Sequence, residues 1–123
     1  MKAALVLNLG AAIILGVLFV ALLYTVPARA ETCGIWTTWY GTESGNRTAN
    51  GESFDGTSLT AAHRTHAFGT KLRVSYKGKS VVVRVNDRGP AKWTGNSLDL
   101  SKAAAQRIGM LHAGRVKTCV QEL

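Results

Sequence analysis

The chain opens with one long hydrophobic run and then changes to short stretches in which hydrophobic and polar positions alternate. Residues 3–26 are almost entirely apolar, one lysine precedes them, and Ala28-Arg29-Ala30 follows them. A basic start, an apolar run and an A-x-A pattern are typical of a secretory signal peptide, so we predict one over residues 1–30. An N-terminal membrane anchor is the alternative, because the run is long enough to span a bilayer. Both interpretations place residues 31–123 outside the cytoplasm, as one small secreted or periplasmic domain.

Alternation in the rest of the chain predicts short strands separated by turns. Residues 71–76 and 79–85 each place their hydrophobic side chains on one face, and Lys77-Gly78 between them predicts the turn of a hairpin. Three further strands are expected at residues 34–41, 98–100 and 114–123.

Other segments depart from this alternation. Residues 42–58 form a polar, glycine-rich loop that is longer than most loops in compact domains, which makes it a candidate for function. Residues 59–69 predict a short helical turn followed by a tight glycine turn. Ser101 is a candidate N-cap for a helix over residues 102–108, and Gly109 is expected to end that helix. Four or five strands with one small helix indicate a mainly β domain, and a small closed barrel is favoured because it leaves no exposed sheet edge.

Two cysteines, Cys33 and Cys119, lie near the two ends of residues 31–123. In an oxidising compartment such a pair is expected to form a disulfide, which would close a loop of nearly the whole domain. A metal site is not favoured, because the chain lacks enough ligands at a plausible spacing, and we expect neither a metal nor a cofactor. Lipid modification of Cys33 is not favoured either, because Glu31 and Thr32 are not the small residues that it requires.

The net charge of the chain is +8, with 15 basic and 7 acidic residues. A basic exported domain is attracted to polyanions, which outside the cell are cell-wall polymers or membrane surfaces. No run of Lys and Arg interleaved with aromatic residues supports nucleic-acid binding, so no nucleic acid is expected as a partner. Contact with a membrane is expected only through residues 1–30, if they stay uncleaved.

Candidate chemistry gathers in three turn-like stretches, which place Glu52 in NGE, His63 in AAH and Asp87 in NDRGP. If the barrel closes, loops from different strands can bring these side chains to one groove. Each also has an ordinary structural interpretation: Asp87 can cap a turn, Glu52 can be solvated, and His63 can be a packing residue. Trp39 and Tyr40 are consecutive strand residues, so one of them faces away from the core, where an aromatic ring can stack on a sugar.

The order and spacing of these motifs resemble the rare lipoprotein A (RlpA) family of septal lytic transglycosylases. The resemblance rests on TWYG at 38–41, TANGESFDGTSLTAAH at 48–63, VNDRGP at 85–90 and SLDLSKAAAQRIGM at 97–110, and it covers roughly residues 38–120. It implies a six-stranded double-psi β-barrel with one short helix over residues 31–123, a fold shared with expansins and barwin-like proteins. It also implies an enzyme that cleaves the glycan strands of peptidoglycan without water.

The motifs of this family, matched one by one, suggest roles for individual residues. Asp87 matches the catalytic acid, and Glu52 and His63 match two further groove residues needed for activity. Asp99 matches a recurrent aspartate that we interpret as positional support. The candidate substrate-binding residues are Tyr40, Asn86, Arg88, Trp39 and Trp93.

Such an enzyme protonates the oxygen between N-acetylmuramic acid (MurNAc) and N-acetylglucosamine (GlcNAc). The same group then accepts the proton of the MurNAc C6 hydroxyl as this attacks C1, which yields 1,6-anhydro-MurNAc. One carboxyl suffices, whereas ordinary glycosidases use two. Asp87 must start protonated, and we expect burial or a nearby carboxylate such as Glu52 to favour that form. Arg88 is expected to turn away from Asp87, toward substrate carboxylates or a backbone carbonyl.

The alternative function is a non-catalytic, expansin-like module that binds and loosens cell-wall polysaccharide through aromatic stacking and its basic surface. The presence of Glu52 together with His63 favours the enzyme. The expected partners are peptidoglycan glycan strands, with cell-wall or divisome proteins as further candidates, and the domain is expected to be a monomer.

Overall fold

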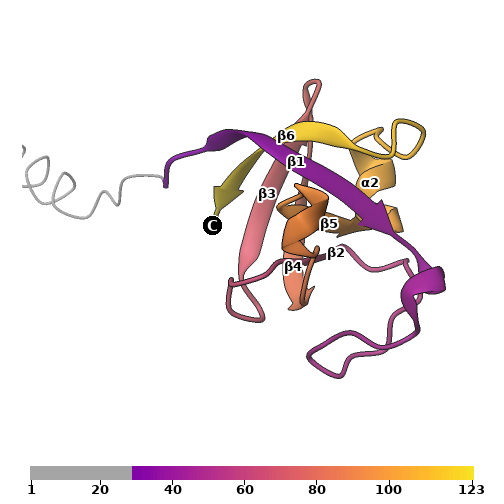
Figure 1. Ribbon diagram of the computed structural model, residues 1–123. Helices are drawn as coiled ribbons and strands as arrows, with labels where there is room; N and C mark the ends of the chain where they lie inside the picture. Colours follow the sequence, from indigo (N-terminus) through magenta and orange to yellow (C-terminus); the bar gives the residue numbers. More distant parts are fainter. Residues whose placement is uncertain (1–28) are drawn as a thin grey trace, which may run out of the picture.

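Six strands close into a barrel in the computed structural model, which describes residues 29–123 (Figure 1). The strands follow the order β1-β5-β2-β4-β3-β6 around the barrel, and β6 pairs with β1 to close it. The expectation of a six-stranded barrel with one short α-helix is confirmed for this part of the chain. The strands are β1 (Thr32–Tyr40), β2 (Thr60–Ala62), β3 (Lys71–Tyr76), β4 (Lys79–Asp87), β5 (Leu98–Ser101) and β6 (Val116–Glu122).

The β3–β4 hairpin confirms the prediction made from alternation. Its register runs from Tyr76 opposite Lys79 to Lys71 opposite Arg84. Lys77 and Gly78 form the two-residue turn, both with positive φ, which is the geometry that suits a tight hairpin. The strand β4 continues two residues beyond the predicted end, so that Asp87 is its last residue.

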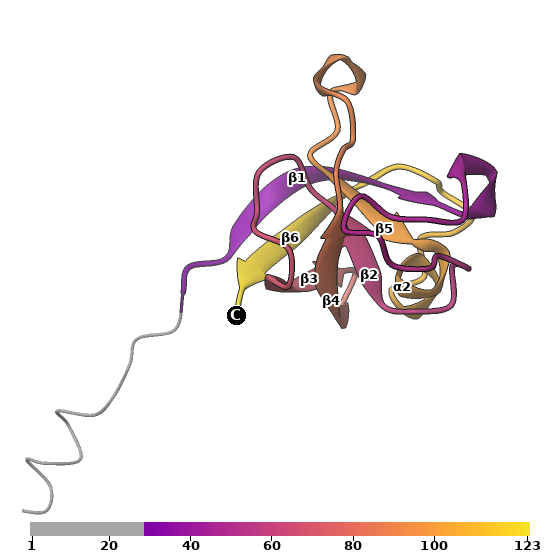
Figure 2. The same cartoon turned by 90° about the horizontal axis from the view of Figure 1, so that it is seen from below.

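Two long loops connect strands that are not neighbours in the barrel. β5 lies between β1 and β2, and β2 lies between β4 and β5, so a tight turn cannot join either consecutive pair. β1 runs parallel to β5, and β2 runs parallel to β4. The loop 41–59 contains the short 3-10 helix η1 (Thr42–Ser44), and the loop 88–97 contains η2 (Lys92–Thr94). Figure 2 shows the loop with η2 projecting from the barrel.

The prediction of a helical turn at the start of residues 59–69 is wrong, because Thr60–Ala62 form strand β2. All three residues are buried, so the segment has no alternation to reveal a strand. Ala61 pairs with Val85 of β4 on one side and with Leu100 of β5 on the other. Tertiary pairing on both sides therefore overrides the helical preference of the two alanines.

The helix predicted at 102–108 is confirmed as α2 (Lys102–Arg107). The Ser101 hydroxyl caps it by accepting from the N–H of Ala104 at 3.3 Å. Ala104 and Ala105 are fully buried and place the helix against the barrel. Leu72, Val74, Val83, Val85, Leu98, Leu100, Ile108 and Met110 are the largest apolar side chains in the buried core.

The predicted disulfide between Cys33 and Cys119 is present and links β1 to β6, the strands that close the barrel. The two ends of the described chain lie on the same side of the molecule (Figure 1), and Arg29 forms an ion pair with Glu122 at 2.7 Å. Most of the signal peptide predicted over 1–30 falls outside the described residues. Within residues 29–123, no helix is long and apolar enough to cross a membrane.

Candidate active site

Asp87 lies at the end of β4, and its carboxylate accepts three hydrogen bonds. Its Oδ2 accepts from the Tyr40 hydroxyl at 3.0 Å. Its Oδ1 accepts from the backbone N–H groups of Ala49 and Arg88, each at 2.9 Å. The donors come from β1, from the loop 41–59 and from the residue after β4. Asp87 is only partly buried, so its carboxyl is held in one orientation while a ligand can still reach it.

Tyr40 is the aromatic residue that approaches Asp87. Its side chain is buried, with 8% exposed, and its ring stacks on Phe54 with 4.7 Å between the ring centroids. Burial, followed by the charge of Asp87, raises the pKa of the Tyr40 phenol above its usual range. The phenol therefore keeps its proton and acts as a donor to Asp87.

A second carboxyl, that of Asp99, lies at the same level of the barrel as Asp87. The register aligns Asp99 with Thr38 of β1 and with Ala62 of β2, and it aligns Ala62 with Asp87. Neighbouring strands are about 4.8 Å apart, so only one small residue separates the two aspartates along this row. Burial is the main reason that the pKa of Asp99 rises to about 6. The charges of Asp87 and Glu43 add to this rise, while a hydrogen bond from Thr38 opposes it.

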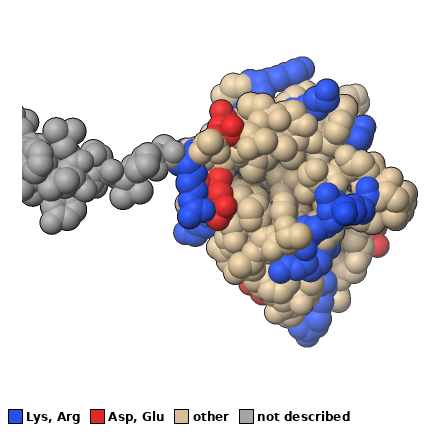
Figure 3. All heavy atoms as spheres, turned by 60° about the vertical axis from the view of Figure 1, so that its left-hand side comes forward, with Lys and Arg blue, Asp and Glu red and all other residues tan. Residues whose placement is uncertain are grey.

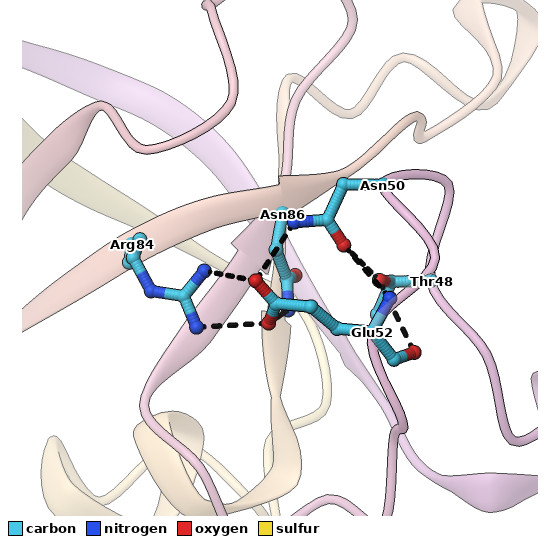
Figure 4. A network of polar contacts seen from close by, with 5 residues as sticks. All are labelled: Thr48, Asn50, Glu52, Arg84 and Asn86. Atoms are coloured by element: carbon cyan, nitrogen blue, oxygen red, sulfur yellow. Dashed lines mark hydrogen bonds and ion pairs between the residues drawn. The ribbon is translucent and has the colours of Figure 1, made fainter.

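Glu52 is bound to the outer side of β4 (Figure 4). Arg84 donates to both of its carboxylate oxygens, at 2.6 and 2.9 Å. Asn86 Nδ2 donates to Oε2 at 3.1 Å, and Asn50 Nδ2 donates to Oε1 at 2.8 Å. The hydrogen bonds from Arg84, Asn86 and Asn50, in that order, lower the pKa of Glu52 to about 2. Among residues 29–123 none of the hydrogen bonds of Glu52 involves Asp87, and the charge of Asp87 contributes to the raised pKa of Asp99.

His63 follows β2 and is joined to Asp87 through the backbone. Its N–H donates to the Asp87 carbonyl at 3.2 Å. Its ring Nδ1 accepts from the N–H groups of Thr65 and His66, at 3.1 and 3.0 Å, which fixes a neutral ring with its proton on Nε2. Burial, followed by the charge of His66, lowers the pKa of His63 to about 4.

The Arg88 side chain turns away from the Asp87 carboxylate, as predicted, and of the two expected partners, substrate carboxylates or a backbone carbonyl, it binds backbone carbonyls. Its guanidinium donates to the carbonyls of His63 and His66, at 3.3 and 2.9 Å. It also lies over the ring of Phe68, 3.9 Å from the centroid. In the described part of the chain no ion pair joins Arg88 to Asp87.

His63 and His66 are among the residues that line a cavity of about 310 Å³. Apolar residues of β1, β3, β5 and β6 form much of its wall, and Asp87 and Glu52 do not contribute to it. A backbone hydrogen bond therefore links Asp87 to a residue that lines this cavity.

The two predicted substrate-binding tryptophans, Trp39 and Trp93, are not among the hydrogen-bond donors to the Asp87 carboxylate in the described part of the chain. Trp39 packs against the core, and its Nε1 donates to the carbonyl of Leu111 at 3.2 Å. Trp93 belongs to η2 in the projecting loop and is 88% exposed (Figure 2). Asn86 is buried, with 2% exposed, and its side-chain amide donates to Glu52.

Three contributors to the site were not identified from the sequence: the side chains of Arg84 and Asn50, and the backbone N–H of Ala49. Arg84 carried a usable signal, because alternation in VRVND places it on the outward face of the strand together with Asn86. The Ala49 N–H carried none, since a backbone donor has no signature of its own in the sequence.

Basic side chains dominate the charged surface on the side where the described chain begins (Figure 3). Within residues 29–123, the one grouping of potential metal ligands consists of Glu31, Cys33 and Cys119. Both sulfurs belong to the disulfide and offer no thiolate to a metal.

Comparison with known proteins supplies the family context. A family described as "Lytic transglycolase" matches residues 32–120. The probable endolytic peptidoglycan transglycosylase RlpA of Synechocystis sp. is 53% identical over 79 residues, which are 62% of this chain and 24% of that protein. The endolytic peptidoglycan transglycosylase RlpA of Pseudomonas aeruginosa is 45% identical over 97 residues, which are 76% of this chain and 28% of that protein. The chain thus spans about a quarter of the length of these curated relatives.

An expansin of Clavibacter michiganensis, solved in complex with cellohexaose, superimposes on the chain with a TM-score of 0.59. The match covers 76% of this chain and 50% of the expansin at 23% sequence identity. At this identity the likeness shows the fold alone, which is a double-psi β-barrel.

Proposed function

The chain belongs to the RlpA-like family of lytic transglycosylases, and from this premise we propose that it cleaves the glycan strands of peptidoglycan with Asp87 as its general acid and base. The observation that carries the proposal is the Asp87 carboxyl itself. Donors from three separate segments hold it at the end of a rigid strand, where it stays partly exposed.

Asp87 gives its proton to the oxygen between MurNAc and GlcNAc as the bond from that oxygen to C1 of MurNAc breaks. GlcNAc leaves as an alcohol. The C6 hydroxyl of MurNAc then attacks C1 and gives its proton to Asp87, which restores the acid. The product ends in 1,6-anhydro-MurNAc, and no water is consumed. One carboxyl serves both steps, because the nucleophile belongs to the substrate.

Tyr40 supports the step in which Asp87 has given up its proton, since its phenol donates to Asp87 Oδ2 and stabilises the carboxylate. Asp99 lies at the same level of the barrel, and two carboxyls so placed resist carrying two negative charges at once. The charge of Asp87 accordingly adds to the burial that raises the pKa of Asp99 to about 6.

The proposed place of action is outside the cytoplasm. The Cys33–Cys119 disulfide supports this, because such bonds persist in oxidising compartments. We propose export through a cleaved signal peptide over residues 1–30, and N-terminal sequencing of the exported protein should then begin at Glu31. Sequencing that begins at Met1 would favour the membrane anchor.

A digest of purified peptidoglycan tests the proposed activity. Wild type and Asp87→Asn are incubated with intact and with peptide-stripped glycan, and the products are read by mass spectrometry after borohydride reduction. Wild type should yield 1,6-anhydro ends, which borohydride does not reduce, and Asp87→Asn should yield none. Asp55→Asn is the matched control, because Asp55 is an exposed loop aspartate whose carboxylate binds only within its own turn. Reducible ends from wild type would contradict the mechanism, and binding to the wall without any product would favour the expansin-like module.

A further inference from the structure

The Glu52 carboxylate is bound to β4 at the residues that directly precede Asp87. Val83 and Val85 face the core, with 1% and 0% exposed, so Arg84 between them points outward. Alternation is interrupted after Val85, because the register with β2 shifts there: Ala61 pairs with Val85, and Ala62 pairs with Asp87. The Glu52 carboxylate binds Arg84 and Asn86. It therefore fixes the loop 41–59 to the end of the strand that carries Asp87.

The loop that contains Glu52 also brings a backbone donor to Asp87. The Ala49 N–H donates to Asp87 Oδ1 at 2.9 Å, and the Asn50 N–H donates to the Asn86 carbonyl at 3.2 Å. Asn50 joins these contacts to Glu52, because its Oδ1 accepts from the Glu52 N–H at 3.1 Å and its Nδ2 donates to Glu52 Oε1. The loop is thus bound to β4 through the Glu52 carboxylate, as Figure 4 shows, and it presents the Ala49 N–H to Asp87.

We propose that Glu52 and Arg84 form a clamp that holds the loop against β4 and thereby positions the Ala49 N–H on the Asp87 carboxylate. In this assignment Glu52 is a positioning residue, and the proton transfers belong to Asp87. The role in catalysis rests on the proposed function, whereas the clamp itself does not.

The electrostatics of Glu52 agree with this assignment. The hydrogen bonds from Arg84 and the two asparagines hold its pKa near 2, so Glu52 has no proton to donate near neutral pH. Both carboxylate oxygens are engaged by the paired nitrogens of Arg84, a geometry that fixes the side chain in place. A lysine at position 84 would keep the charge but lose the paired contact.

A double-mutant cycle tests the clamp with the full exported protein. The variants are Glu52→Gln, Arg84→Met and the two combined, with formation of 1,6-anhydro ends as the activity. The rate at which each single variant forms anhydro ends should be about 100-fold below that of wild type, the loss typical of a misplaced catalytic group. The rate of the double variant should be no lower than that of either single variant. The pH dependence of the residual activity should keep its shape, because the acid is intact. The activity of Arg84→Lys should lie between that of wild type and that of Arg84→Met.

Arg73→Met is the matched control. Arg73 is an exposed outward arginine on β3 that donates to Gln121 of β6 at 3.3 Å, so its loss removes a similar charge and leaves the loop in place. Its activity should equal that of wild type. An Arg84→Met variant with full activity beside an inactive Glu52→Gln would overturn the clamp and favour a chemical role for Glu52. The clamp would also be overturned if the pH profile of activity lost its acidic or its basic fall-off in Glu52→Gln but not in Arg84→Met.

Amide hydrogen exchange tests the clamp without reference to activity. The Ala49 and Asn50 N–H groups should exchange faster in Glu52→Gln and in Arg84→Met than in wild type, while the β3–β4 hairpin amides stay protected. Unchanged protection of Ala49 in both variants would refute the clamp even if the wild type is an active enzyme. If the wild type forms no anhydro ends but the protection changes as expected, the clamp holds and the proposed activity fails.

Discussion

Replacing Asp99 by asparagine is expected to stabilise the folded protein near neutral pH but not in acid. Asp99 lies between β1 and β2, and its pKa rises from 3.8 to about 6 on folding, chiefly through burial. The folded protein therefore binds more protons than the unfolded chain between these values, and its stability falls as the pH rises through the window. Asparagine keeps the shape of the side chain and an acceptor for Thr38, and it carries no charge to bury.

The size of the effect follows from the pKa values. One pKa unit corresponds to about 1.4 kcal/mol, so an ionised Asp99 costs the folded state on the order of 3 kcal/mol. The difference in unfolding free energy between Asp99→Asn and wild type should therefore grow by this amount from pH 3.5 to pH 7. The other titrating groups are shared by the two proteins and largely cancel in the difference.

Urea unfolding followed by tryptophan fluorescence at several pH values between 3.5 and 8 measures this difference. Asp55→Asn is the control, because hydrogen bonds from Thr57 lower the pKa of Asp55 and the sign of its effect should be opposite. A difference between Asp99→Asn and wild type that does not change with pH would refute the reasoning. A loss of relative stability with rising pH would refute it as well, and would mean that the Asp99 carboxylate is stabilised rather than penalised.

Four further predictions concern activity, stability and binding. Tyr40→Phe keeps the stack on Phe54 but removes a donor to Asp87, so initial rates of anhydro-product formation should fall about 10-fold, as for one hydrogen bond to a charged group. Replacing Cys33 and Cys119 by serine opens a loop with a sequence separation of 86 residues, and denaturant unfolding should show a loss of about 4–5 kcal/mol. His63 binds a proton in the unfolded chain below pH 6.5 but in the folded protein only below about pH 4, so the free energy of unfolding should fall as the pH drops through this window. In His63→Gln, urea unfolding at several pH values should no longer show this part of the pH dependence. Trp93→Ala should weaken sedimentation onto peptidoglycan and leave the thermal midpoint unchanged, because the ring is 88% exposed.

The local sequence pattern was sufficient to predict the strands in which hydrophobic and polar residues alternate. The β3–β4 hairpin was predictable because each strand has one buried face and Lys77-Gly78 supplies the turn. The helix α2 was predictable because Ser101 marks its start. Strand β2 was not, since Thr60–Ala62 is buried on all sides, and its strand character comes from β4 and β5, which lie far away in the sequence.

The candidate site likewise has residues that could be predicted from the local sequence and residues that could not. Asp87 stands where a hydrophobic strand meets a turn, so its position could be read locally. The environment of Glu52 could not, because its partner Arg84 lies on a strand 32 residues away in the chain. The nearness of Asp99 to Asp87 depends on the register across β5, β2 and β4, and on a strand that the pattern failed to show.

Two segments hold the end of β4 at Asp87 by hydrogen bonds, the loop 41–59 and the turn that follows β2. On one side the loop with Glu52 donates from Ala49 to the Asp87 carboxylate. On the other side the His63 N–H donates to the Asp87 carbonyl, and the turn that His63 caps supplies the carbonyls that hold Arg88. Glu52 and His63 therefore reach Asp87 through backbone groups rather than through their own side chains. The end of β4 is thus held by backbone contacts from two neighbouring segments, which is the rigid support that the proposed role of Asp87 requires.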